Sequence, residues 1–354
     1  MNKAFLPLPL IFVSLLLAIW AGWLRIGWTL PVTDAAAQHG ALMTGSFLAS
    51  LIFLERAVTF KNKIILLVPA VNAASVLFFL FENPIAAQWC LLLGSGGFVC
   101  MCAYFIYKYR ELYYAVFLAG ALALFCGNVV LLQTANYPHA VVWWMVFLLF
   151  TIVAERLELS RFLALTPWKR TALLTALGLT ILSLFLRADK SGETFFAISL
   201  ILIAAWLLKY DMAWHAVKLP GQHRYSAVLL ITGYVWLLLS ALLFILKHAV
   251  VFSYDAALHS FFIGFVFSMI FSHAPIILPA VLKWSFKIYR PVLYVWFGLL
   301  QASLIIRMAG DVWGNLSLRK WGGLLNGISI LLFFITILLI VQRQLQKRKE
   351  LRQA

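Results

Sequence analysis

Residues 38–58 read QHGALMTGSFLASLIFLERAV, an apolar stretch with a histidine near its start and a Glu-Arg pair near its end. Residues 138–158, PHAVVWWMVFLLFTIVAERLE, align with it without a gap. In both stretches the glutamate follows the histidine by sixteen residues, which is about 24 Å of α-helix. Each stretch predicts a membrane-crossing helix, and their alignment predicts an internal repeat. A Glu-Arg pair is also typical of a membrane boundary, where long charged side chains reach water.

The whole chain shares this apolar character. Of its 354 residues, 64% are hydrophobic and 11% are charged, whereas an ordinary soluble domain has about 25% charged residues. No water-soluble fold of this length could bury so much apolar surface, which excludes a soluble enzyme, a disordered chain and a DNA-binding domain. The four cysteines lie in apolar stretches and form no C-x-x-C pair, so neither a secreted disulfide scaffold nor a zinc site is indicated.

Twelve runs are long and apolar enough to predict spanning helices. The predicted spans are Phe5–Leu24, Ala35–Leu54, Ile64–Phe81, Ala87–Tyr107, Tyr113–Leu132, Pro138–Ala154, Ala172–Leu186, Thr194–Leu208, Ala227–Leu246, Ala256–Val281, Pro291–Ile306 and Trp321–Val341. No segment between them is long or polar enough for a second domain. We therefore expect an all-α, multi-pass membrane protein with a single polytopic transmembrane domain over residues 1–354.

The basic residues set the orientation of these helices. With both termini in the cytoplasm, 21 of the 28 Lys and Arg residues fall on the cytoplasmic side and 7 on the outer side. This bias follows the positive-inside rule, so topology and anionic lipid account for most of the net charge of +16. We expect the lipid bilayer as a partner, and no nucleic acid.

Three histidines fall at one depth in this topology. His39, His139 and His259 lie near the outer ends of the second, sixth and tenth helices. Because they recur on every fourth helix, we expect the twelve transmembrane helices in a pseudo-threefold (4+4+4) arrangement. An ionisable residue inside a membrane helix is a functional candidate by default, although a single histidine there is more often a hydrogen-bonded residue of the packing.

Twelve helices in three sets of four, with these histidines, resemble the catalytic subunit of haem-copper oxidases. The stretch around His39 is also similar to the NnrS-type haem- and copper-containing membrane proteins of nitric oxide response. Residues 258–282, LHSFFIGFVFSMIFSHAPIILPAVL, are similar to the other histidine-bearing helix of that group. The resemblance covers the helix count and these two segments. It implies the inner (cytoplasmic) membrane of a bacterial cell, with respiratory or electron-donor proteins as partners.

The resemblance also implies one haem b, bound near the outer face by His39 and His259. Two neutral imidazoles make a six-coordinate, low-spin iron. Arg307, at the outer end of the eleventh helix, would pair with the haem propionates, or would simply reach the membrane boundary as a snorkelling arginine. Gly40 and Gly264 would let a flat macrocycle approach the helices, although membrane glycines more often serve helix packing.

The copper site of the oxidases is not reproduced. The seventh run has no histidine where the oxidases have an adjacent pair, so oxygen reduction by the usual route is not expected. His139 and His248 are left as a weak alternative pair of copper ligands. His273 lies fourteen residues beyond His259, which is about 21 Å farther along an α-helix and turned by about 40°. It therefore cannot bind a haem at the same level.

Three functions stay open at this point, and whether the protein is an enzyme is also open. The first is haem binding for nitric oxide response, electron transfer or metal-centre assembly. The second is secondary transport of a small solute, because twelve helices with both termini inside are also common in transporters. The third is an accessory subunit without a cofactor. Transporters usually carry ionisable or broken-helix features near the midplane, and the scarcity of ionisable residues there favours haem.

Overall fold

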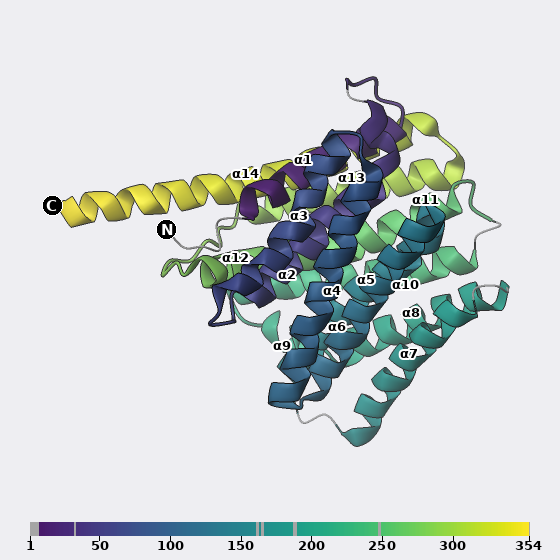
Figure 1. Cartoon of the computed structure of the whole chain (residues 1–354), viewed down its shortest axis with the longest axis horizontal. Coiled ribbons are helices and arrows are strands. Elements are labelled where there is room, and N and C mark those ends of the chain that lie inside the picture. The colour runs from purple at the N-terminus through teal and green to yellow at the C-terminus, as the bar shows by residue number, and fades with distance from the viewer. Residues whose placement is uncertain are drawn as a thin grey trace. The chain divides into compact units, whose positions relative to one another are not determined.

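A computed structural model describes residues 7–31, 33–160, 163, 166–186, 190–246 and 249–353. Every regular element in these residues is a helix, and ten of the helices are long and apolar enough to cross a membrane (Figure 1). Each of the twelve predicted runs overlaps a helix. The prediction of an all-helical chain is confirmed, and its long apolar helices fit a multi-pass membrane protein.

The chain divides into two compact units, Met1–Leu165 and Thr166–Ala354. In the first unit six predicted runs become helices, and the second of these consists of η3 continued by α2. The elements are α1 (Leu8–Arg25), η2 (Thr33–Gln38), η3 (Ala41–Ala49), α2 (Ser50–Ala57), η4 (Lys63–Leu66), α3 (Leu67–Leu80), α4 (Pro84–Tyr109), α5 (Leu112–Thr134) and α6 (Tyr137–Ser160).

The second unit contains the other six predicted runs. Its elements are α7 (Pro167–Phe185), α8 (Lys190–Tyr210), α9 (Ala213–Ala216), α10 (Gln222–Ile245), α11 (Ser253–His259), η5 (Ser260–Phe267), α12 (Ser268–Leu282), α13 (Leu293–Trp313) and α14 (Leu316–Gln353). The tenth run is therefore one continuous path through α11, η5 and α12. The division into two units does not itself reveal three sets of four, so the 4+4+4 arrangement stays a prediction.

Tight turns join the long helices, and their sequence chemistry is clear at the turn between α3 and α4. Glu82 takes a left-handed conformation with φ of 55° after α3 ends. The Asn83 side chain then accepts a hydrogen bond from the backbone N–H of Ala86, 3.1 Å away, and Pro84 occupies the first position of α4. An asparagine cap followed by proline satisfies an otherwise unpaired N–H and starts the new helix at once.

Two π-helices interrupt the spans that carry His39 and His259, which the sequence analysis did not predict, whereas α6 with His139 is continuous. The segment η3 begins two residues after His39, and η5 begins directly after His259. A π-helix bonds residue i to i+5, is rare, and is found frequently at functional sites. Because it winds more residues into each turn than an α-helix, the 40° turn expected between His259 and His273 does not hold.

Side chains satisfy the backbone of both π segments. In the first unit, Asn72 Nδ2 donates to the carbonyl of Gly45 at 2.7 Å and to Ser50 Oγ at 2.8 Å. In the second unit, Ser268 Oγ donates to the carbonyl of Gly264 at 2.6 Å. Interrupted membrane helices need such partners, because no water is present in the hydrocarbon to bond the freed carbonyls.

The two aligned stretches of the first unit are joined at both ends. Tyr137 Oη donates to Gln38 Oε1 at the histidine end, and Arg56 Nη2 lies 2.8 Å from Glu155 Oε1 at the Glu-Arg end. Both bonds join residues 99 positions apart, so the two helices run parallel, one residue out of the register of the sequence alignment. The Glu-Arg pairs therefore do more than mark a boundary, since the arginine of one binds the glutamate of the other.

Candidate functional site

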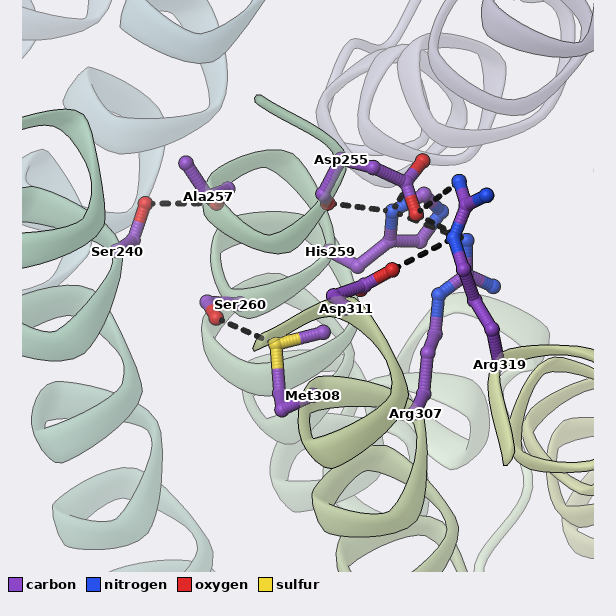
Figure 2. A network of polar contacts seen from close by, with 9 residues as sticks. All are labelled: Ser240, Asp255, Ala257, His259, Ser260, Arg307, Met308, Asp311 and Arg319. Atoms are coloured by element: carbon purple, nitrogen blue, oxygen red, sulfur yellow. Dashed lines mark hydrogen bonds and ion pairs between the residues drawn. The ribbon is translucent and has the colours of Figure 1, made fainter. Parts of the chain in front are cut away.

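Five ionisable side chains meet at one end of the second unit, and we call them the charge cluster (Figure 2). They are Asp255 and His259 on α11, Arg307 and Asp311 on α13, and Arg319 on α14. Asp255 Oδ2 lies 2.8 Å from Arg307 Nη2 and 3.0 Å from Arg319 Nη2. Asp311 Oδ1 lies 2.6 Å from Arg319 Nε. Two carboxylates and two guanidiniums thus form a continuous network that links three helices.

Helical spacing and two glycines bring these groups together. The two members on α11 and the two on α13 are each four residues apart, so each pair shares one face of its helix. A Cβ on Gly310 would lie only 2.5 Å from the backbone N of Arg319. A Cβ on Gly322 would likewise lie 2.6 Å from the backbone N of Arg307. Glycine at these positions therefore permits α13 and α14 to approach closely enough for Arg319 to reach Asp311.

Burial makes this pairing necessary. Asp311 is 0% exposed and Arg307 is 5% exposed. An isolated charge in an apolar interior is strongly unfavourable, and two carboxylates beside two guanidiniums remove the imbalance. The hydrogen bonding is incomplete, because Arg307 Nε and Asp311 Oδ2 are buried and have no hydrogen-bond partner. The charge cluster is therefore a neutral set of charges fixed in place, with two polar atoms still unpaired.

Hydrogen bonding assigns the tautomer of His259. Its Nδ1 lies 2.8 Å from the backbone carbonyl oxygen of Asp255. A carbonyl only accepts, so Nδ1 carries the proton and, in the neutral ring, the lone pair is on Nε2. Nδ1 also lies 3.3 Å from Asp255 Oδ1, which favours the same tautomer. The 3.4 Å contact between Nδ1 and Arg307 Nη2 joins two donors and is not a hydrogen bond.

His39 has the same tautomer, obtained from a different helix. Its Nδ1 lies 2.8 Å from the backbone carbonyl oxygen of Ala18 on α1. Gly22, one turn farther along α1, leaves room for the ring, because a Cβ there would lie 3.0 Å from His39 Cε1. The ring is half-buried in the first unit. A ligating histidine usually donates its second ring N–H to a carbonyl or carboxylate, and both histidines meet this condition.

The two predicted copper ligands and His273, whose role the sequence left open, are placed as follows. His139 is exposed in the first turn of α6, and His248 lies outside the described residues. His273 is half-buried, and its Nδ1 lies 2.7 Å from the carbonyl oxygen of Met269 on the same helix. In the part of the chain that the structure describes, no three His, Cys, Asp or Glu side chains group closely enough to hold a metal ion. The copper alternative gains no support.

The two glycines considered for a macrocycle face aromatic side chains. A Cβ on Gly264 would lie 2.4 Å from Trp236, and one on Gly40 would lie 3.6 Å from both Trp144 and Tyr137. Close packing therefore accounts for Gly264, whereas a Cβ on Gly40 would make only ordinary van der Waals contacts. Arg307, expected to meet a propionate, lies against the carboxylate of Asp255.

Sequence reasoning missed three members of the charge cluster: Asp255, Asp311 and Arg319. A signal was present in the spacing, because an acidic and a basic or imidazole residue stand four apart twice, as Asp255 with His259 and Arg307 with Asp311. Charges of opposite sign at helical spacing near the ends of neighbouring apolar runs predict an ion-paired cluster. Following that signal would have found four of the five members.

No curated protein and no solved structure matches the chain. A family model described as a domain of unknown function, DUF8744, matches residues 5–342. The match includes the predicted helices, His39 and the whole charge cluster. The chain therefore belongs to the DUF8744 family.

Proposed function

We propose that this protein binds one b-type haem through Nε2 of His39 and Nε2 of His259. The observation that carries the proposal is the shared state of these rings. Each donates Nδ1–H to a backbone carbonyl at 2.8 Å and directs its lone pair to Nε2, and each stands next to a π segment. A fixed tautomer with a basic Nε2 is what an axial haem ligand needs.

His39 and His259 have the residue type and the tautomer that a bis-histidine haem requires. Two imidazoles give six-coordinate, low-spin iron, and no third protein ligand is required. A bound haem supplies a redox-active iron that exchanges electrons or responds to a small gas such as nitric oxide. The chain itself would orient the two rings, through Ala18 and Gly22 for His39 and through its own helix for His259. A propionate would have to share Arg307 with Asp255, so we assign this arginine first to holding Asp255.

The proposal includes a topology. Both termini lie in the cytoplasm, the histidines lie near the outer face, and the helices form three sets of four in the inner membrane of a bacterial cell. The basic-residue bias supports this orientation. The resemblance to haem-copper oxidases and NnrS-type proteins is the basis of this part of the proposal. The proposed role is electron transfer or nitric oxide response, with electron-donor proteins as partners.

A second candidate, a small-solute transporter, is favoured by the interrupted helices. Secondary transporters often place polar side chains beside broken spans. Asn72 bonds a carbonyl of η3, and Gln301 Nε2 lies 3.5 Å from Ser268 Oγ at the end of η5. These contacts put polar groups at both π segments in the interiors of the units.

The absorption spectrum of the purified, reduced protein tests both candidates. We expect the sharp bands of a low-spin b-type haem. His39→Ala or His259→Ala should remove these bands or convert them to a five-coordinate form. His215→Ala, an exposed residue of α9, is the matched control and should leave the spectrum unchanged. Unchanged haem content and spectrum in both single variants would overturn the ligand assignment and favour transport.

A further inference from the structure

An open groove of about 620 Å³ lies between α7 and α8. Its lining consists of Trp168, Thr171, Ala172, Thr175, Ala176, Leu202 and Trp206. The residues on α7 run from Trp168 to Ala176, which is about 12 Å of helix. Small alanines form the hollow and larger side chains border it, so the lining is mainly apolar, as an acyl chain requires.

The floor of the groove is fixed. Trp206 is 5% exposed, and its indole N–H donates to the backbone carbonyl of Lys169 at 2.7 Å. Trp168 at the rim is 59% exposed and packs edge-on against Tyr210, with ring centroids 5.9 Å apart. Amphipathic tryptophan and tyrosine rings of this kind are enriched at the level of lipid headgroups.

The same end of the groove is basic. Lys169 Nζ lies 5.0 Å from the centre of the Tyr210 ring, and Lys209 Nζ lies 5.5 Å from it. Arg170 is exposed next to Lys169. The neighbouring acid, Asp211, is 3% exposed and accepts a hydrogen bond from the backbone N–H of Ala213. Its charge is therefore directed into the fold, and the rim presents mainly cations.

We propose that the α7–α8 groove binds an anionic phospholipid. One acyl chain lies against Ala172, Ala176 and Leu202, and the phosphate lies at Lys169 and Lys209. Charge complementarity selects the occupant, because a zwitterionic lipid fills the same hollow but carries a cation that the basic rim repels. This site is independent of the haem proposal and uses none of its residues.

Native mass spectrometry of the purified full-length protein can measure this binding. The probes are phosphatidylglycerol and phosphatidylcholine with identical acyl chains. We expect phosphatidylglycerol to bind at least tenfold more tightly, and Lys169→Gln/Lys209→Gln to remove most of that preference. Lys61→Gln/Lys63→Gln loses the same charge from two exposed residues of the first unit and should keep the preference. Thr175→Trp, at an exposed position in the groove, should weaken the binding of both lipids.

Three results would overturn the proposal. The first is equal binding of the two lipids, and the second is an unchanged preference for phosphatidylglycerol in Lys169→Gln/Lys209→Gln. The third is an equal loss of that preference in the control variant Lys61→Gln/Lys63→Gln. Inorganic phosphate alone should not compete with the lipid, and full competition would replace the lipid site by a phosphate site. Lipid binding is compared only among variants whose thermal unfolding midpoint equals that of the unmodified protein. Thr175→Trp tests the groove even if the lysine variant fails to fold.

Discussion

His39 in the first unit and His259 in the second have the same tautomer in different surroundings. His39 lies against the backbone of α1, with the Ala18 carbonyl as acceptor and Gly22 beneath the ring. His259 uses the carbonyl of Asp255 on its own helix and lies among two carboxylates and two guanidiniums. The first ring therefore depends on helix packing, and the second on local helix geometry supported by charge.

The same tautomer is therefore held by two kinds of interaction. Close packing is short-ranged, so the state of His39 should respond to single methyl groups on α1. The charges around His259 act over a longer range, and removing one leaves a partner without its opposite charge. The two sites should therefore fail under different substitutions.

Removing the central carboxylate of the charge cluster should have the largest effect on stability. Asp255→Asn leaves Arg307 buried without its ion-pair partner, and we expect the free energy of unfolding to fall by about 3–5 kcal/mol. Thermal or denaturant unfolding of the purified protein measures this loss. Asp34→Asn, at an exposed aspartate, is the matched control and should cost less than about 0.5 kcal/mol. Equal effects of the two variants would show that the charge cluster contributes nothing to stability.

A methyl group beside His39 should have an intermediate effect. In Gly22→Ala the new Cβ would lie 3.0 Å from His39 Cε1, so the ring must move away from the Ala18 carbonyl. Gly178→Ala on α7 meets nothing within 4 Å and should gain the usual helix propensity of alanine. We expect Gly22→Ala to be about 1–2 kcal/mol less stable than Gly178→Ala. Equal stabilities would mean that packing against α1 does not hold the ring.

The smallest effect is expected where the two aligned stretches meet beside His39. Tyr137→Phe removes the hydroxyl that donates to Gln38, at an expected cost of about 0.5–1.5 kcal/mol. A double-mutant cycle with Gln38→Ala measures the coupling. Tyr107→Phe is the control, because Tyr107 is 80% exposed and its hydroxyl should matter little. Strictly additive effects of Tyr137→Phe and Gln38→Ala would show that this contact does not hold the two stretches together.

Much of the helical layout could be predicted, because it depends on local composition. Every predicted run overlaps a helix, and the helices that contain the aligned stretches 38–58 and 138–158 run parallel. The π segments could not be predicted. Apolar composition favours any backbone that satisfies its own hydrogen bonds, and it does not distinguish i→i+5 from i→i+4 bonding.

Composition alone predicts a multi-pass membrane protein, because a chain with 64% hydrophobic residues needs the bilayer as its solvent. The sequence also indicated His39 and His259 as candidate ligands, because they lie in predicted membrane helices. The groups that face these two histidines depend on the fold: a carbonyl of α1 for His39, and for His259 a set of charges from α11, α13 and α14. Asp255 and Arg307 stand 52 residues apart, and only the folded path of the chain brings them together, where the buried Arg307 requires a partner of opposite charge.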